Sequence, residues 1–360
     1  MTLAAYAIVD LAAVKHNLAR VREYAPNSKI MAVIKANAYG HGLLQIAKAL
    51  EGVDGIAVAR VDEAVLLRKA KVKCRITVLE GFVCEPELNE LIQYKLDSVV
   101  HSIGQLDILE KYSEHKPVST WLKLDSGMNR LGFTADEFVS AYQRLEKCPS
   151  VKQPVSLMTH FSSADDKNSD ATKQQIKIFN QLVSSYPGEK SIANSAGIIA
   201  WPDSLSDWVR PGIMLYGVSP FYEYHGADLG LQPVMSLHAR LISVKMIKPG
   251  DAVGYSGTWV CSKETRLGVV AIGYGDGYPR AVKSGTPVLV NGKRVPLVGR
   301  VSMDMITVDL SSQPDSKPGD KVTLWGDGLA IEEIAAAADT IPYTILCGVT
   351  QRVRIENVTA

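Results

Sequence analysis

Basic and aromatic side chains stand at the ends of apolar, strand-like segments in the first two-thirds of the chain. Lys35 is the most informative of them, because it lies in the segment AVIKANAYGHG (32–42), which begins as an apolar run. A lysine in apolar surroundings loses solvation, which lowers its pKa and makes its amine a better nucleophile. A Schiff-base lysine needs such an amine, whereas a lone lysine at a strand end more often extends into solvent.

Polar residues at the ends of other apolar segments favour the chemical interpretation. They are Lys123, Arg130 in the loop behind it, His160, Asn194, Ser195, Arg210 and Tyr216. In a (β/α)8 barrel, active residues gather at the C-terminal ends of the strands. Several such residues on separate strands therefore predict a single site that includes Lys35.

Two short glycine-containing turns could bind a phosphate group near this site. They read NSAG (194–197) and RPGI (210–213). Barrel enzymes often hold a phosphate after their seventh and eighth strands, and glycine lets the backbone approach an anion. Either turn alone could be an ordinary glycine turn, but the two together predict a phosphate site to which Ser195 adds a hydroxyl.

The elements that would position these residues alternate between apolar strands and helices. Eight strand-like runs cover residues 29–36, 55–60, 75–81, 96–102, 119–125, 154–162, 189–195 and 209–217. Several are continuously apolar, as expected of parallel strands buried on both faces. The pattern predicts the α/β class, with an N-terminal (β/α)8 TIM barrel over residues 1–230. An open doubly wound sheet is the alternative, but no strand–GxGxxG–helix fingerprint supports it.

The pattern changes in residues 231–360, which we expect to form a C-terminal, mostly-β domain. Short apolar runs are separated by turn sequences, among them KPGD (248–251), VNGK (290–293) and a second KPGD (317–320). Such turns are typical of hairpins, and the two KPGD sequences are interpreted as similar turns rather than as a repeat. One late helix is expected at residues 328–339.

Composition excludes several classes of function. The 360 residues carry 39 Lys and Arg and 38 Asp and Glu, for a net charge of +1, so neither nucleic acid nor a membrane surface is an expected partner. The 5 cysteines form no CxxC pair, and the N-terminus does not resemble a signal peptide; a cytoplasmic protein is predicted. No metal site is expected, because five further histidines lack partners at ligand spacing. These are His41, His101, His115, His225 and His238.

Long motifs along the whole chain resemble the alanine racemase family. They are AVIKANAYGHG (32–42), KLDSGMNRLG (123–132), THFSSAD (159–165), WVRPGIMLYG (208–217), VGYSGTW (253–259), GYGDGYPR (273–280) and VGRVSMDM (298–305). The resemblance implies a pyridoxal phosphate (PLP) enzyme that interconverts L- and D-alanine, with a (β/α)8 barrel and a C-terminal β domain. It also implies a head-to-tail homodimer in which both chains build each active site.

The resemblance assigns the catalytic roles to two residues. Lys35 would carry PLP as an aldimine and act as the base for D-alanine, and Tyr255 of the partner chain would be the base for L-alanine. The residues that would bind the cofactor are Lys35, Tyr39, His160, Ser195, Arg210, Gly212, Ile213 and Tyr216.

Other matched positions would bind the substrate or support the site. Arg130 and the backbone at Met303 would face the substrate, while Tyr274, Asp304 and Lys123 would support them. Lys123 matches a lysine that is carbamylated in some members. The position of Gln351 is a tyrosine near the phosphate in some members, so this departure puts that contact in doubt.

Three other functions compete with an alanine racemase. A non-catalytic PLP-binding protein would resemble the barrel but lack the second domain with Tyr255. A decarboxylase of the same architecture is disfavoured by the segment around Lys35. A racemase of broader specificity, for serine or other amino acids, stays open. So does the choice between D-alanine biosynthesis for peptidoglycan and D-alanine breakdown.

Overall fold

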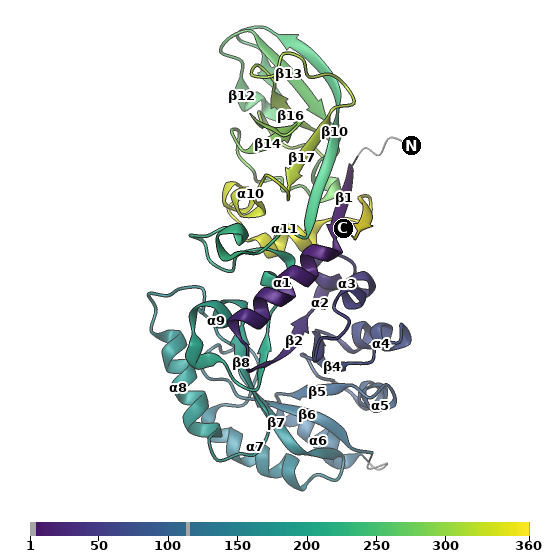
Figure 1. Cartoon of the computed structure of the whole chain (residues 1–360), viewed down its shortest axis with the longest axis vertical. Helices are drawn as coiled ribbons and strands as arrows, with labels where there is room; N and C mark the ends of the chain where they lie inside the picture. Colours follow the sequence, from purple (N-terminus) through teal and green to yellow (C-terminus); the bar gives the residue numbers. More distant parts are fainter. Residues whose placement is uncertain (1–4, 113–115, 360) are drawn as a thin grey trace.

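The computed structural model describes residues 5–112 and 116–359; His115 lies outside them. Figure 1 shows a barrel surrounded by helices, with a β-rich region beyond one end of it. None of the described helices combines the length and the apolar character that crossing a membrane requires.

Eight parallel strands close into the predicted barrel, in the order β2-β3-β4-β5-β6-β7-β8-β9. Their bounds are β2 Lys29–Val33, β3 Gly55–Val58, β4 Arg75–Val78, β5 Asp97–Val100, β6 Val118–Lys123, β7 Val151–Met158, β8 Lys190–Asn194 and β9 Trp208–Arg210. The last strand returns to the first through the pairs Lys29 with Trp208 and Ile30 with Val209. Each predicted strand is present, and most are shorter than the apolar run that predicted them.

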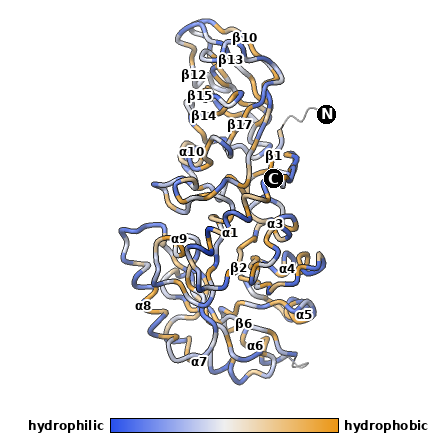
Figure 2. Tube along the Cα trace, in the orientation of Figure 1, coloured by the Kyte–Doolittle hydropathy of each residue, from blue (hydrophilic) through white to orange (hydrophobic). Residues whose placement is uncertain are grey.

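Helical segments follow the barrel strands, and most of them cover the outside of the barrel, whereas α2 is a left-handed turn at the cavity. They are α1 Leu11–Tyr24, α2 Lys35–Tyr39, α3 Leu43–Ala49, α4 Val61–Lys69, α5 Glu85–Gln93, α6 Ile103–Lys111, α7 Ala135–Lys147, α8 Ala171–Val183 and α9 Ser195–Ala200, with short 3-10 turns η1 Pro202–Ser204, η2 Ile213–Tyr216 and η3 Gly226–Leu229. The Asp10 carboxylate caps α1 by accepting from the backbone N–H groups of Ala12 and Ala13. Along α5, α7 and α8 the colours in Figure 2 alternate between hydrophobic and hydrophilic, as expected of helices with one face on the barrel.

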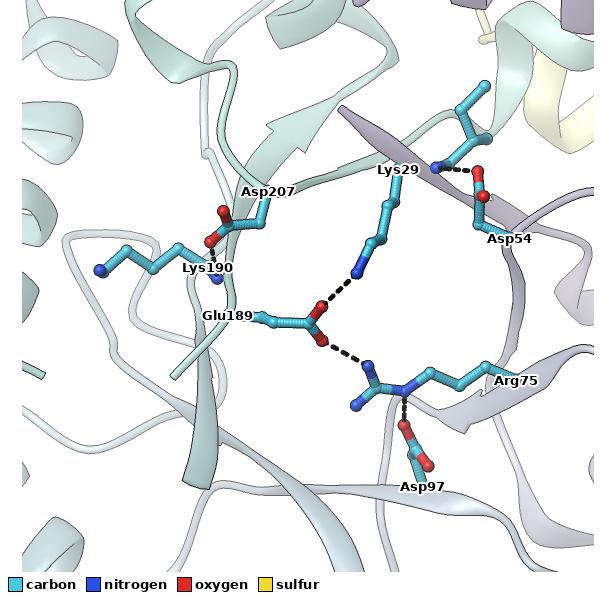
Figure 3. Close-up of polar contacts among 8 residues, drawn as sticks. Lys29, Asp54, Arg75, Asp97, Glu189, Lys190 and Asp207 are labelled. Atoms are coloured by element: carbon cyan, nitrogen blue, oxygen red, sulfur yellow. Dashed lines mark hydrogen bonds and ion pairs between the residues drawn. The ribbon is translucent and has the colours of Figure 1, made fainter. Parts of the chain in front are cut away.

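Charged residues close the N-terminal end of the barrel, which we call the floor. Arg75, the first residue of β4, pairs with Asp97 and, at 2.6 Å, with Glu189. Glu189 also accepts a hydrogen bond of 2.7 Å from the Lys29 ammonium (Figure 3). The guanidinium of Arg75 lies 5.0 Å and 5.4 Å from the ring centres of Trp121 and Trp208. The floor is thus filled by paired charges and by two indole rings packed edge to face.

The second region is built on an eight-stranded sheet. Its main path runs β15-β14-β17-β10-β1-β18, and β13 pairs with β10 and β16. The bounds of its strands are β1 Ala5–Asp10, β10 Met235–Ile247, β13 Thr265–Val270, β14 Pro287–Val290, β15 Lys293–Pro296, β16 Ile306–Asp309, β17 Lys321–Trp325 and β18 Arg354–Val358. A separate two-stranded sheet consists of β11 Ala252–Val253 and β12 Trp259–Val260, and the 3-10 turns η4 Tyr255–Gly257 and η5 Tyr274–Asp276 lie between strands. β1 was not predicted. It comes first in the chain but pairs with β10 and β18, more than 220 residues away.

The turn sequences behave as predicted. In β14–β15, Val290 pairs with Lys293 across Asn291 and Gly292, whose φ angles of 49° and 79° fit a two-residue hairpin turn. In both KPGD turns the aspartate accepts a hydrogen bond from the backbone N–H of its lysine, so the two are the same local structure. The expected late helix is α10 Ile331–Ala337, and a second helix, α11 Pro342–Gly348, follows it. Pro342, which commonly begins helices, was the missed signal.

Candidate active site

A cavity of about 880 Å³ opens at the C-terminal ends of the barrel strands, which we call the mouth. The predicted site residues that line it are Lys35, Tyr39, Lys123, Arg130, His160, Ser195, Arg210, Gly212 and Ile213. Asn194, singled out at a strand end, lines it as well. The polar strand ends therefore meet in one place, as the barrel pattern predicted.

Lys35 begins a left-handed turn rather than ending a strand. The strand expected over residues 29–36 stops at Val33, and residues 36–39 have φ angles of 51–54°. Left-handed backbone costs roughly 1–2 kcal/mol per non-glycine residue, so surrounding contacts must hold it. The Ala38 N–H donates to the Ile34 carbonyl at 2.9 Å, and the Glu63 carboxylate accepts from the Asn37 N–H at 3.4 Å. Such strain is typical of functional sites.

The amine of Lys35 is biased toward its neutral form. Burial lowers its pKa, and the positive charge of Arg130 lowers it further. Glu80 and Glu63 oppose this shift with negative charge. A half-buried lysine with a lowered pKa is available as a nucleophile or as a base.

Lys123 lies in the same field. It is buried at the end of β6, and burial, together with Arg210 and Arg130, lowers its pKa to about 8. Among the described residues, no carboxylate forms an ion pair with Lys35, Lys123, Arg130 or Arg210. The mouth therefore has a surplus of cationic groups, which favours an anionic ligand.

Arg210 is fixed by uncharged partners. Only 4% of it is exposed. Its guanidinium donates to the Ser191 hydroxyl at 2.6 Å and to the carbonyls of Thr159 and Ile192 at 2.6 Å and 3.1 Å. It also lies 3.3 Å from Nδ1 of His160. Burial and the charge of Arg210 lower the pKa of His160 well below its usual range. A guanidinium only donates, so Nδ1 accepts and the neutral imidazole carries its proton on Nε2.

Ser195, Gly212 and Tyr39 form a small cradle on one wall of the cavity. The Ser195 hydroxyl accepts from the N–H of Gly212 at 2.9 Å and from that of Met214 at 3.4 Å, which leaves its own proton free to donate. A Cβ atom at Gly212 would lie 2.6 Å from the Tyr39 hydroxyl. Only glycine leaves this space open, and a phosphate could occupy it beside two hydroxyl groups.

Tyr216 lies behind this cradle, not in it. It is absent from the cavity lining, and its hydroxyl donates to the Val33 carbonyl at 3.2 Å. Its ring stacks on Tyr39 at 4.7 Å between ring centres. The predicted contact between Tyr216 and a cofactor is therefore replaced by a supporting contact to Tyr39.

A hydrogen-bonded loop presents Arg130. The carboxylate of Asp125 accepts from the N–H groups of residues 127–129. The loop is closed by bonds from Asp125 N–H to the Phe133 carbonyl at 2.8 Å and from Phe133 N–H to the Lys123 carbonyl at 2.9 Å. The loop therefore has its own internal structure and can be expected to move as a unit.

The site residues predicted in the second region form a separate group. Tyr255, Tyr274, Met303 and Asp304 do not line the cavity of their own chain. The backbone of Gly275 bonds the Met303 carbonyl at 2.8 Å, which joins the Tyr274 and Met303 segments. Tyr255 is 67% exposed and Met303 51%. A single chain thus does not bring them to Lys35.

The helices α10 and α11 cover one side of the cavity. The sequence predicted the first of them but not its place at the cavity, and it did not predict the second. Tyr343 of α11 lines the cavity and lies 5.9 Å from Tyr39 between ring centres, and burial beside Asp165 raises its pKa. Gln351 is exposed and is not part of the lining. A tyrosine, Tyr343, therefore stands near the cradle, whereas Gln351 does not reach the cavity.

Known proteins similar to this chain share one description. The family models "Alanine racemase, N-terminal domain" and "Alanine racemase, C-terminal domain" match residues 9–220 and 234–357. The chain is 53% identical to an alanine racemase of Aeromonas hydrophila over 355 residues, 99% of each chain. It is 50% identical to the biosynthetic alanine racemase of Escherichia coli, again over 99% of each. The crystal structure of the biosynthetic alanine racemase from Pseudomonas aeruginosa matches with a TM-score of 0.96 and 43% identity, over 99% of this chain and 100% of that one.

Proposed function

The chain belongs to the alanine racemase family, whose reaction is the interconversion of L- and D-alanine, and we propose that it uses PLP held on Lys35, with Lys35 and Tyr255 as its two proton-transfer groups. The observation that carries the proposal is the position of Lys35, a lysine of lowered pKa in a cation-rich cavity beside a cradle for a phosphate.

The residues present fit the cofactor. The Ser195 hydroxyl, the Tyr39 hydroxyl and the open space at Gly212 suit a phosphate group, and the backbone of Ile213 lines the same wall. When bound, PLP supplies an electron sink that stabilises negative charge at the substrate's α carbon. Side chains of the protein transfer the protons and orient the substrate.

Lys35 can take up or return the α-proton on one face of the substrate. Its lowered pKa keeps a larger share of neutral amine at physiological pH than an ordinary lysine has. Once protonated, the ammonium remains close to Glu80 and Glu63. These carboxylates would limit how far the pKa falls, so the group can both gain and lose a proton.

Arg210 would face the pyridine nitrogen of the cofactor. Its guanidinium stays protonated, because burial lowers its pKa only to about 10, so it cannot accept a proton from the ring. Its four hydrogen bonds prevent it from turning away. Keeping the ring nitrogen unprotonated weakens the electron sink, which should limit side reactions such as transamination.

The second proton-transfer group would come from a second copy of the chain. Racemisation removes a proton from one face of the α carbon and returns one to the other, which two opposed groups do without rearrangement. Tyr255 is exposed and remote from the cavity of its own chain. A head-to-tail homodimer would place it, with Tyr274 and the backbone at Met303, over the partner's Lys35. Arg130 would bind the substrate carboxylate.

The alternatives are weaker on this chain. A non-catalytic PLP-binding protein is disfavoured by the second domain, which carries Tyr255. A broader racemase differs only in the substrates it accepts and is tested by serine. Relatives described as biosynthetic favour D-alanine production for peptidoglycan. The cysteines occur as free thiols, which supports a reducing compartment such as the cytoplasm.

The first test follows L-alanine in D2O with PLP-loaded protein. We expect D-alanine labelled with α-deuterium and little pyruvate, and a loss of at least a thousandfold in both Lys35→Ala and Tyr255→Phe, since each removes an essential proton-transfer group. D-serine formed at a comparable rate would favour the broader racemase. Absence of D-alanine from a protein with bound PLP would overturn the proposal.

Mixing the two inactive variants tests the shared site. In a head-to-tail dimer, a mixed pair of Lys35→Ala and Tyr255→Phe chains carries both changes in one site and neither in the other. Activity should therefore reappear after the subunits exchange. If each chain used its own Tyr255, the mixture would stay inactive.

A further inference from the structure

Gln175 is a buried glutamine that lies next to the cavity without lining it. It belongs to α8 on the outside of the barrel (Figure 1), and only 2% of it is exposed. Its carboxamide oxygen accepts from the N–H and the hydroxyl of Ser162 at 3.0 Å and 3.1 Å. Its NH2 group donates to the Ser126 hydroxyl at 3.3 Å and to the His160 carbonyl at 3.1 Å. The amide is fully hydrogen-bonded, and only one orientation allows this.

These partners lie in two different loops of the mouth. Ser126 belongs to the loop that presents Arg130, while His160 and Ser162 follow β7. Gln175 therefore joins the Arg130 loop to the end of β7. A Cβ atom at Gly127 would touch the Gln175 side chain at 3.5 Å, so the loop also packs directly against it.

The connection continues to Arg210 through Thr159. The hydroxyls of Ser126 and Thr159 lie 2.7 Å apart, and the Thr159 carbonyl accepts from Arg210 at 2.6 Å. A continuous, buried chain of hydrogen bonds thus runs from Gln175 through Ser126 and Thr159 to the guanidinium of Arg210. Satisfied buried networks of this kind fix the relative positions of their members.

We propose that Gln175 is a positioning residue for racemisation, which fixes the Arg130 loop relative to the His160–Arg210 pair. The inference rests on the proposed function, in which Arg130 binds the substrate carboxylate. It differs from that function because Gln175 contacts neither substrate nor cofactor. It acts by setting where the Arg130 loop sits.

Because the Arg130 loop has internal hydrogen bonds of its own, we expect the loss of the Gln175 amide to change the position of the loop and not its shape. Asp125 and Phe133 hold the loop together independently of Gln175. Without the amide, the loop should keep its shape but lose its attachment to β7. Binding of a carboxylate at Arg130 should weaken, whereas the cradle at Ser195 and Gly212, which Gln175 does not contact, should be unaffected.

The chain offers a matched control in Gln105. It is also a buried glutamine on a barrel helix, 3% exposed on α6. Its carboxamide accepts from the His101 N–H at 2.7 Å and donates to the Phe82 carbonyl at 3.0 Å, so it joins the loops after β4 and β5. Replacing it removes the same kind of interaction from loops that carry neither Arg130 nor the His160–Arg210 pair.

The experiment compares Gln175→Met with Gln105→Met in the PLP-loaded protein. Methionine keeps the length of the side chain and removes its hydrogen bonds. We expect Gln175→Met to raise KM for L-alanine and the dissociation constant of acetate by about tenfold, as the loss of one or two hydrogen bonds predicts. The affinity for PLP should stay within about twofold in both variants, and Gln105→Met should leave KM and acetate binding within the same range.

Hydrogen exchange gives a readout that does not depend on activity. The amides of residues 127–129 should exchange faster in Gln175→Met than in Gln105→Met. If Gln175→Met fails to fold, Ser126→Ala removes only the loop's side of the connection and should shift KM in the same direction by less.

The outcomes separate this inference from the proposed function. Equal losses in the two methionine variants, or unchanged acetate binding in Gln175→Met, would overturn the positioning role while wild-type racemisation stands. A wild-type protein that neither racemises alanine nor binds acetate would overturn the proposed function, and with it any catalytic role for Gln175.

Discussion

The floor and the mouth of the barrel both hold arginine and lysine side chains, and they differ in what these side chains meet. At the floor, Arg75 contacts Asp97 and Glu189 (Figure 3). Its guanidinium also lies within 5.4 Å of the ring centres of Trp121 and Trp208. Lys29 completes the group by pairing with Glu189. Two cations thus meet two carboxylates, and the charges are balanced.

At the mouth, the cations are not balanced in this way. Arg210 is bound by carbonyl and hydroxyl oxygens and by His160. Lys35 and Lys123 have lowered pKa values, to which nearby arginines contribute. Hydrogen-bond acceptors hold Arg210 in place, but its charge remains available to a ligand.

The difference separates stability from function within one barrel. Paired charges at the N-terminal end stabilise the closed barrel, in keeping with the usual division of labour in this fold. Unpaired cations and a left-handed turn at the C-terminal end cost stability, which is the common consequence of preparing a site for an absent ligand. Substitutions at the two ends should therefore change the free energy of unfolding in opposite directions.

The largest effect is expected at the floor. Arg75→Met leaves Asp97 and Glu189 without their shared partner. Removing one member of a fully buried ion pair typically costs about 3–5 kcal/mol of unfolding free energy, and because the Arg75 side chain is 25% exposed, we expect a loss that approaches the lower end of this range. Urea unfolding at a fixed protein concentration measures it. Racemase activity per folded protein should not change, because Arg75 lies at the opposite end of the barrel.

Arg144→Met is the matched control for the floor. Arg144 also pairs with two carboxylates, Asp107 and Glu110, but their side chains are 47% and 40% exposed, whereas that of Asp97 at the floor is 10% exposed. Exposed pairs contribute about 0–1 kcal/mol. Equal losses in the two variants would show that the floor is no more than a surface ion-pair network, and the comparison would fail.

A substitution at the mouth should stabilise the protein. Lys123→Met removes a buried cation whose pKa is lowered from 10.5 to about 8. A lowered pKa means that protonated Lys123 opposes folding, by on the order of 1–3 kcal/mol below pH 8. Urea unfolding of the cofactor-free protein should show this gain at pH 7. It should shrink as the pH rises from 8 toward 10.5, where the amine is neutral in both states. A loss of stability at pH 7 would mean that Lys123 is compensated.

Sequence patterns were sufficient for the elements that obey local rules. The eight barrel strands follow from apolar runs, the hairpin at Asn291 and Gly292 from its turn residues, and the cavity-lining lysines and arginines from their place at strand ends. In each case the signal lies within a few residues of the feature that it predicts.

The missed features depend on contacts between distant segments. The strand β1 is identifiable only through its pairing with β10 and β18. Gln175 looks like any polar residue of an amphipathic helix until α8 packs against two loops. Tyr216 belongs to the motif at residues 208–217 and Tyr343 to none of the motifs. Only packing shows that Tyr343 lines the cavity and that Tyr216 lies behind Tyr39.

The last prediction measures the imbalance at the mouth directly. Pulse acetylation with mass spectrometry reports how much neutral amine Lys123 has at each pH. We expect a midpoint near pH 8, because burial, Arg210 and Arg130 together favour the neutral form. In Arg130→Gln the midpoint should rise by a fraction of a unit, since only the third of these causes is removed. A neutral amine near pH 8 is also what reaction with CO2 requires, so 13C-bicarbonate should give a carbamate signal that Lys123→Met lacks. A midpoint that stays near 10.5 would mean that a negative charge already compensates the cations of the mouth. The two ends of the barrel would then differ in the partners of their cations and not in their charge balance.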